Sequence, residues 1–197
     1  MIQLFMDTSY KTMTVACIKD NEVVSFYHDY SFKTQSELAM PTLEKIMNQA
    51  NLHPQQIDEM IITLGPGSYT GVRIAMSIAK TLAAISDVKI KTITSLEMFV
   101  STNQETLVVC DARSDRAYVG LFKNKQYVIG PSVLPIADIQ HIIDQNKPMI
   151  VGDAHLFDLQ DNFELNETIL LDAINQAKEV VDVDHLKPLY LKEMSAY

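Results

Sequence analysis

Three glycines and a proline within seven residues are the strongest chemical signal in this sequence. The stretch Gly65-Pro66-Gly67-Ser68-Tyr69-Thr70-Gly71 follows the apolar run 60–64 and precedes the long apolar stretch 72–85. This order predicts a strand, a glycine loop and a helix, because glycine allows tight turns and close approach to the backbone. Free N–H groups at the start of such a helix can bind an anion. The loop is therefore either a phosphate-binding loop or a structural corner.

The spacing of these glycines matches neither common phosphate-binding pattern. Gly65, Gly67 and Gly71 are spaced G-x-G-x-x-x-G, whereas the dinucleotide fingerprint is G-x-G-x-x-G. The Gly-Lys-Ser/Thr of a P-loop is also missing. We therefore interpret the loop as a structural corner, formed by Gly65, Pro66, Gly67, Ser68 and Gly71.

Other residue types that do chemistry are present but are poorly arranged for it. The run Asp111-Ala112-Arg113 with Asp115 and Arg116 could form an acid–base cluster, although a charged hairpin turn between two strands is the interpretation we favour. Cysteine and serine residues lack a histidine at a spacing typical of a nucleophile and its base. The histidines are scattered, and none are three or four residues apart as a shared helix face requires; they are His28, His53, His141, His155 and His185. We predict no catalytic residue, no metal site and no cofactor in this chain.

Composition restricts the class of protein. The chain has 197 residues, of which 47% are hydrophobic and 21% charged, as in ordinary soluble proteins. Its net charge of −9 argues against tight binding of nucleic acid by this chain alone, because such binding depends on Lys and Arg. Cys17 and Cys110 are isolated in apolar runs, which fits free thiols in a reducing compartment. We find no signal peptide and no apolar run long enough for a membrane span, and expect a cytoplasmic protein.

The predicted elements occur in the same order twice. The first series has strands at 4–7, 13–18, 23–28 and 60–64 and helices at 36–50 and 72–85, followed by a strand at 89–93 and a helix at 95–100. The second has strands at 107–111, 116–122, 126–129 and 149–152 and helices at 136–144 and 172–181. A β-β-β-α-β-α order that repeats predicts a duplicated α/β fold. We expect one half at 1–103 and an abbreviated half at 104–197.

The helix at 72–85 is apolar on nearly all of its faces. Its more polar strip consists of Arg73, Ser77, Lys80, Thr81 and Ala84. A helix that is apolar all round is expected to be buried on all sides. It is either a central core helix or a helix that a second protein covers on one side.

The repeated order resembles that of the actin-like ATPase (ASKHA) superfamily. There the first hairpin turn reads Asp-x-Gly-Thr/Ser and holds nucleotide phosphates, whereas this chain reads Asp7-Thr8-Ser9-Tyr10. Asp7 stands where such an ATPase would hold magnesium, but we favour a turn-capping aspartate because the glycine is absent. The superfamily resemblance leaves one alternative function open, an autonomous nucleotide-dependent enzyme such as a small kinase or peptidase.

Several motifs together resemble the bacterial TsaB (YeaZ) family across nearly the whole chain. They are Asp7-Thr8-Ser9, the loop and helix start at 65–74, Ala79-Lys80-Thr81-Leu82-Ala83, Asp111-Ala112-Arg113 with Tyr118, and Pro188-Leu189-Tyr190-Leu191-Lys192. The sequence departs from the family where Gln35-Ser36-Glu37 replaces His-Ser-Glu and where Lys192 replaces arginine. The chain is also short for the family.

This resemblance implies a non-catalytic partner subunit. Family members bind the TsaD catalytic subunit, and a TsaE ATPase joins the pair to put a threonylcarbamoyl group on an adenosine beside the tRNA anticodon. The resemblance implies ATP and a metal in the partner subunits, a homodimer when the chain is alone, and tRNA contact only through the complex. The His-x-x-x-His metal pair of TsaD-like subunits is absent from the matching helix at 35–50.

The family's partner surface is built from the two helices of the first half. Methionine adapts to irregular contact surfaces, and the helix at 36–50 is amphipathic. We therefore expect the interface to include Met40, Leu43, Met47, Arg73, Ser77 and Lys80.

Overall fold

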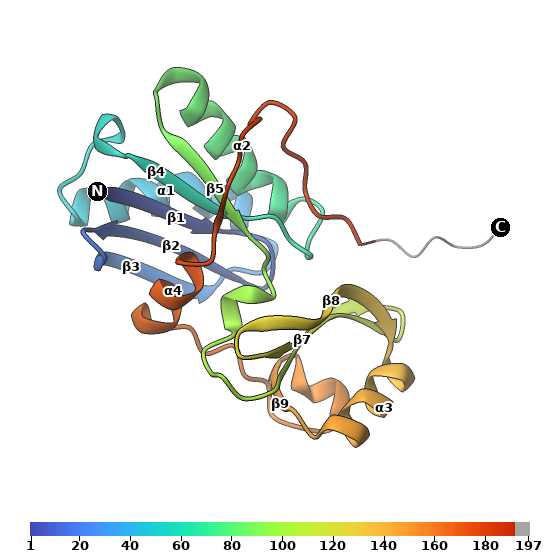
Figure 1. Ribbon diagram of the computed structural model, residues 1–197. Coiled ribbons are helices and arrows are strands. Elements are labelled where there is room, and N and C mark those ends of the chain that lie inside the picture. The colour runs from blue at the N-terminus through green and yellow to red at the C-terminus, as the bar shows by residue number, and fades with distance from the viewer. Residues whose placement is uncertain (192–197) are drawn as a thin grey trace.

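A six-stranded mixed sheet forms the first half of the computed structural model, which describes residues 1–191 (Figure 1). Its first strands are β1 (Ile2–Asp7), β2 (Thr12–Lys19) and β3 (Glu22–Tyr30), which form an antiparallel meander. The strands β4 (Glu59–Thr63) and β5 (Lys89–Ile93) then add in parallel to β1. The short strand β10 (Lys178–Glu179) completes the order β10-β5-β4-β1-β2-β3.

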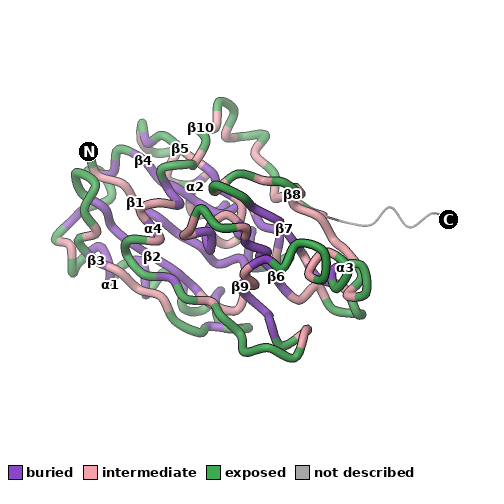
Figure 2. The backbone as a smooth tube through the Cα atoms, turned by 60° about the horizontal axis from the view of Figure 1, so that its bottom comes forward, coloured by how far each residue is buried: buried purple, intermediate pink, exposed green. Residues whose placement is uncertain are grey.

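The two faces of this sheet are covered by different segments, because side chains alternate along a strand. Leu4 and Met6 of β1 belong to a core shared with the helices α1 (Gln35–Gln49) and α2 (Gly71–Ile85). Phe5 belongs to a second core, with the short 3-10 helix η2 (Glu97–Phe99) and the helix α4 (Glu167–Ile174). Figure 2 shows the central strands as buried backbone inside an exposed shell.

The second half repeats this plan in a shorter form. The strands β6 (Thr106–Arg113), β7 (Arg116–Lys123) and β8 (Gln126–Pro135) form a meander, and β9 (Met149–Gly152) pairs in parallel with β6. The helix α3 (Ile136–Asn146) packs on this four-stranded sheet through Ile139. The two mixed sheets confirm the predicted duplicated α/β fold with an abbreviated second half.

The chain then returns to the first half. The sequence predicts a helix at 172–181, but α4 lies at Glu167–Ile174 because the side chain of Asn166 caps it by accepting from the Ile169 N–H at 3.0 Å. Leu170 and Ala173 of α4 are fully buried in the core that Phe5 shares. Residues 178–179, predicted as helix, pair with β5.

Two further sequence predictions are wrong in detail. The predicted helix at 95–100 is only the single 3-10 turn η2, and the Ser95 hydroxyl donates to the Pro66 carbonyl of the glycine loop. The helix α1 starts at Gln35, one residue before the predicted start, and makes no side-chain cap bond. Between α1 and β4 the chain forms the 3-10 helix η1 (Pro54–Gln56). Lys192, one of the departures from the family pattern, lies outside the described residues. None of the described helices has the length and apolarity needed to cross a bilayer.

Candidate functional site

The glycine loop packs backbone to backbone against the turn between β1 and β2. A Cβ atom on Gly67 would lie 2.2 Å from the Ser9 carbonyl oxygen, and one on Gly71 would lie 2.2 Å from that of Thr8. The Ser68 N–H donates to the Ser9 carbonyl at 2.7 Å. These positions need glycine because the two backbones are in contact, so the loop residues fill the space directly over the turn.

The side chains of Asp7 and Thr8 form hydrogen bonds that stabilise this corner. The Asp7 carboxylate accepts from the Ser9 N–H at 2.8 Å and from the Thr63 hydroxyl at 2.5 Å. The Thr8 hydroxyl donates to the Gly71 carbonyl at 2.7 Å and accepts from the Ala75 N–H at 3.2 Å. Asp7 therefore acts as a turn-capping residue, as the missing glycine of the turn indicates.

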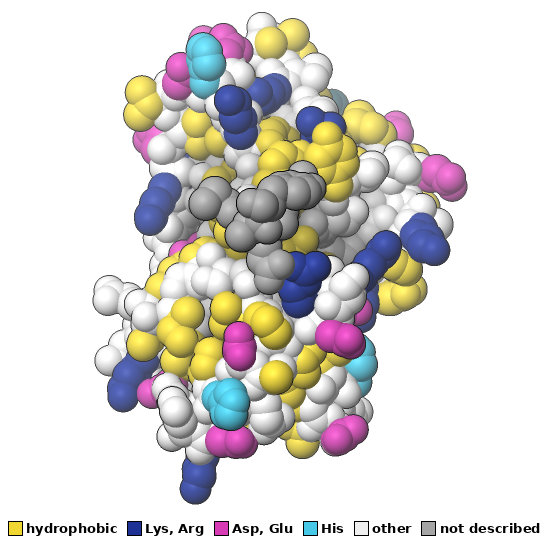
Figure 3. All heavy atoms as spheres, turned by 90° about the vertical axis from the view of Figure 1, so that its right-hand side faces the viewer, with side chains coloured by type: hydrophobic (Ala, Val, Ile, Leu, Met, Phe, Trp, Pro, Cys, Tyr) yellow, Lys and Arg dark blue, Asp and Glu magenta, His cyan; other side chains and the backbone are white. Residues whose placement is uncertain are grey.

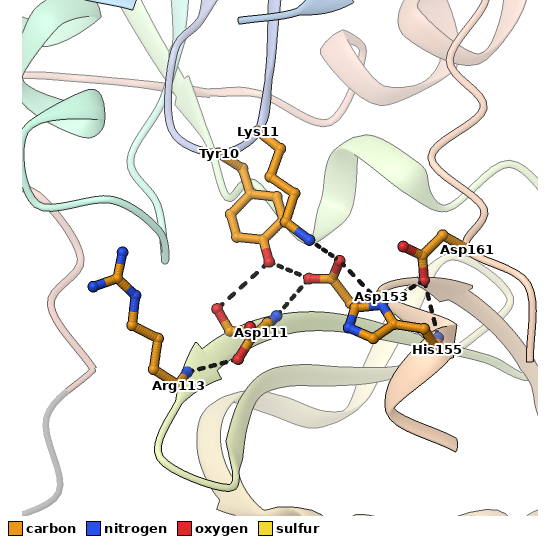
Figure 4. Close-up of polar contacts among 7 residues, drawn as sticks. All are labelled: Tyr10, Lys11, Asp111, Arg113, Asp153, His155 and Asp161. Carbon is orange, nitrogen blue, oxygen red and sulfur yellow. Dashed lines mark hydrogen bonds and ion pairs between the residues drawn. The ribbon is translucent and has the colours of Figure 1, made fainter. Parts of the chain in front are cut away.

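A cleft of about 560 Å³ separates this corner from the second half. Both halves line it, through Lys11, Lys33 and Ser68 on one side and Asp111, Arg113 and Tyr118 on the other. Lys33 and Arg113 form no ion pair with any of residues 1–191. In Figure 4 the Arg113 side chain points away from Asp153 and toward the loops of the first half.

Three side chains hold the two halves together at the inner end of this cleft (Figure 4). Asp153 follows β9 and is fully buried. Its carboxylate accepts from the Lys11 ammonium at 2.5 Å, from the Asp111 N–H at 2.6 Å and from the Tyr10 hydroxyl. We call Tyr10, Lys11 and Asp153 the inter-half bridge. A buried carboxylate needs such partners, because an unpaired buried charge is strongly unfavourable.

The protonation states of Tyr10 and Lys11 are fixed at neutral pH. Burial raises the pKa of the Tyr10 hydroxyl far above its usual range, and the nearby Cys110 and Asp153 raise it further. Burial lowers the pKa of Lys11, but the hydrogen bond and charge of Asp153 outweigh this effect and leave that pKa raised. Tyr10 therefore remains a neutral donor and Lys11 remains charged.

His155 and Asp161 extend the bridge toward solvent. Together with Asp153 they place metal-ligating atoms within 4.8 Å of one another. The Lys11 ammonium already lies 2.5 Å from Asp153, however, so a metal ion would have to displace it. His155 instead contacts Asp161 through its backbone N–H at 2.9 Å and its ring at 2.7 Å. Burial raises the pKa of Asp161, but these two contacts outweigh it and lower that pKa.

A second, shallower groove of about 390 Å³ runs between α1 and α2, and three of the predicted interface residues line or border it. Met40, Arg73 and Ser77 are exposed there, with Met40 58% exposed. Leu43 and Met47 instead belong to the core of the monomer, each only 7% exposed. The other predicted residue, Lys80, donates to the Asp184 carbonyl at 2.8 Å.

The sequence analysis missed Asp153, the residue on which the bridge depends. It lies 142 residues from Lys11, so no local spacing connects them. The sequence does contain one signal for Asp153, because it comes directly after the predicted strand at 149–152. In the structure this strand, β9, pairs in parallel with β6, whose predicted end is Asp111. Parallel neighbouring strands bring the residues at their carboxyl ends together.

The sequence matches known proteins along most of its length. The family model described as "TsaD: tRNA N6-adenosine threonylcarbamoyltransferase" matches residues 30–172. The chain is 31% identical over 156 residues to the tRNA threonylcarbamoyladenosine biosynthesis protein TsaB of Bacillus subtilis (strain 168), a match that covers 75% of this chain and 68% of that relative.

Two solved structures from Pseudomonas aeruginosa share the fold over almost the whole chain. YeaZ has a TM-score of 0.74 at 18% identity and covers 96% of this chain and 99% of its own. A protein described as similar to peptidase YeaZ has a TM-score of 0.77 at 17% identity and covers 97% and 99%. The two meanders and the parallel strand beside each thus define a duplicated α/β protein that shares its fold with these two structures. With the family model and the Bacillus relative, the chain belongs to the TsaB (YeaZ) family.

Proposed function

We propose that this chain is the non-catalytic subunit of a tRNA-modifying complex. It pairs with a TsaD-type catalytic subunit, and a TsaE-type ATPase joins them, for threonylcarbamoylation of the adenosine next to the anticodon in tRNA. The names of the family model and of the Bacillus relative support the pathway. The packing of the glycine loop against the turn at Asp7 and Thr8 supports the accessory role. The side chains of both residues form hydrogen bonds to the backbone of this corner.

The observation that carries the pairing is the groove between α1 and α2. Met40 on α1 and Arg73 on α2 border it and are exposed, while Ile74 and Ile78 line it with partly exposed apolar surface. Interface centres are rich in methionine and arginine. Two helices that present a groove of this kind fit two equivalent helices of a partner, which gives a four-helix contact.

The remaining parts of the proposal concern cofactors and other partners. ATP and a metal belong to the partner subunits, and tRNA reaches this chain only within the complex, since the net charge of −9 disfavours direct binding. The same groove serves a homodimer when the catalytic subunit is absent, so the two assemblies compete. The chain functions in the cytoplasm, where the complex meets its tRNA substrate.

Light scattering on the chain alone and mixed with a TsaD-type subunit of the same organism tests this proposal. We expect a dimer that converts to a one-to-one heterodimer. Arg73→Glu should abolish both species without unfolding the protein, because it reverses a charge at the groove. Lys45→Glu, an exposed charge reversal on α1 outside the groove, is the matched control and should pair normally. Retained pairing of Arg73→Glu would place the interface elsewhere.

The cleft favours a second candidate, an autonomous nucleotide-dependent enzyme. Lys33 and Arg113 face a cavity of about 560 Å³, which is large enough for a nucleotide. Calorimetric titration with ATP and magnesium tests it, with Arg113→Ala as the comparison. Binding heat that the variant loses would favour this candidate, and absence of heat in the wild-type protein would count against it.

A further inference from the structure

The segment after β10 runs along α2 and back to the glycine loop, and we call residues 180–191 the strap. Figure 1 shows it as the dark red segment that passes α2. The Val180 N–H donates to the Ile90 carbonyl at 2.9 Å, and the Leu189 N–H donates to the Leu64 carbonyl at 2.8 Å. Between these points Val183 and Leu186 pack against the core that α2 shares. The strap is therefore attached at both ends and along its middle.

Near its end the strap places one aromatic ring beside the groove. The rings of Tyr190 and Tyr69 are stacked, with centroids 5.3 Å apart and planes inclined by 21°. The Arg73 guanidinium lies 4.3 Å from the centroid of the Tyr69 ring. Tyr69 thus contacts both, so the three side chains form one continuous array, which we call the Tyr–Tyr–Arg array.

This array is exposed although it is ordered by its own contacts. Tyr69 is 60% exposed and Tyr190 is 43% exposed. Tyr69 and Arg73 also line the groove between α1 and α2, so the array continues the groove toward the strap. On the side of the molecule that Figure 3 shows, hydrophobic side chains lie next to lysine and arginine side chains. Tyrosine and arginine are among the residues most enriched at the energetic centres of protein interfaces.

We propose that the strap is a third segment of the partner surface, beside α1 and α2. This inference rests on the proposed pairing with a TsaD-type subunit and says which residues position its contacts. Tyr190 holds the Tyr69 ring, and Tyr69 in turn holds the Arg73 guanidinium at the groove. Rings and guanidinium that are held in place lose little conformational freedom on binding, which strengthens association.

The array also indicates which chemical groups the partner surface must carry. Arg73 forms no ion pair with any of residues 1–191, so its planar donors are available. The fitting partner is an apolar helix face of the catalytic subunit that carries one carboxylate opposite Arg73. A partner face without a carboxylate would leave the guanidinium desolvated and unpaired, which opposes binding.

The test is the dissociation constant of the complex, measured by calorimetry with the TsaD-type subunit of the same organism. Tyr190→Ala should weaken binding roughly ten-fold, the size expected for an interface tyrosine. Tyr190→Phe keeps the ring and should bind like wild type. Val181→Ala is the matched control, because Val181 lies on the same strap and is 99% exposed. Combining Tyr190→Ala with Arg73→Ala should weaken binding less than the product of the two single effects, since both act on one array.

Two outcomes would overturn the inference in different ways. If Arg73→Glu abolishes pairing and Tyr190→Ala binds like wild type, the strap plays no part and the proposed function stands. If both variants bind like wild type, the interface lies elsewhere and the inference fails, whereas a wild-type chain that does not bind the TsaD-type subunit would overturn the proposed function itself. Hydrogen exchange at the Leu189 amide shows whether Tyr190→Ala leaves the strap attached. If it does not, Tyr69→Ala removes the other ring instead, and unchanged affinity in that variant overturns the inference.

Discussion

The two halves of this molecule use the same position in their shared plan in different ways. After β4, the loop at Gly65–Gly71 folds onto the turn of its own half, where Gly67 contacts Ser9 through the backbone. After β9, the corresponding residue Asp153 holds the start of its own turn through the Asp111 N–H. The same carboxylate also reaches the other half through Lys11 and Tyr10.

This difference shows that the two halves of a duplicated fold can take different structural roles. The first half closes its turn by close backbone packing and leaves α1 and α2 free to present a groove. The second half leaves its turn at Arg113 exposed and supplies the buried charge that joins the halves. The comparison predicts that the first corner is sensitive to added volume and that the bridge is sensitive to lost charge.

The largest expected effect comes from adding one methyl group to the closed corner. Gly67→Ala places a Cβ atom 2.2 Å from the Ser9 carbonyl, so the backbone must move, and we expect a loss of about 4 kcal/mol or more in the free energy of unfolding. Urea denaturation measures this. Gly130→Ala is the control, because a Cβ at Gly130 would have no neighbour within 4 Å. Equal stability of the two variants would mean that the corner is loosely packed.

The next effect comes from removing the charge of the inter-half bridge. Asp153→Ala leaves the Lys11 ammonium and the Tyr10 hydroxyl without their acceptor, and we expect a loss of about 3 kcal/mol, the usual result of breaking a buried pair. Asp161→Ala breaks only an exposed contact with His155 and should cost less than about 1 kcal/mol. Urea denaturation of both variants measures these losses in the free energy of unfolding. Similar losses would show that the bridge does not stabilise the fold.

The smallest effect is a pH dependence that arises from a buried histidine of the first half. Burial lowers the pKa of His28, whose ring lies 2.8 Å from the Thr14 hydroxyl. The unfolded chain then binds a proton more readily than the folded one, so this contribution is present above the ordinary histidine pKa of about 6.5 and is lost as pH falls below it. His28→Gln should lose less stability than wild type between about pH 7 and pH 5. Urea denaturation of both proteins at about pH 7 and about pH 5 measures this difference, and equal losses in the two proteins would contradict the prediction.

The sequence contains enough information to predict most of the sheet elements. The alternation of apolar residues and the turn residues around 20 and 124 define both meanders, and the strands at 89–93 and 149–152 lie where they were predicted. The helix at 36–50 and the glycine loop are equally clear, because a spacing of apolar residues or a run of glycines is a local property.

The remaining features depend on contacts between distant residues, which local patterns do not encode. The apolar character of α2 predicts burial on all sides, yet Arg73, Ser77 and Thr81 form an exposed strip. The strap accounts for part of that apolar character, since Val183 and Leu186 pack against the same core. Leu43 and Met47 likewise have the spacing of a contact surface but face the sheet. The bridge from Lys11 to Asp153 is a tertiary contact of the same kind.

The return of the chain to the first sheet has a consequence for how the protein is made. α4, β10 and the strap complete the first half, although a ribosome reaches the start of α4 at residue 167 only after η2 has ended at residue 99. The second sheet, by contrast, is contiguous from residue 106 to residue 152. Closing a short loop costs less entropy than closing a long one. A nascent chain can therefore finish the half that it makes later before the half that it makes first.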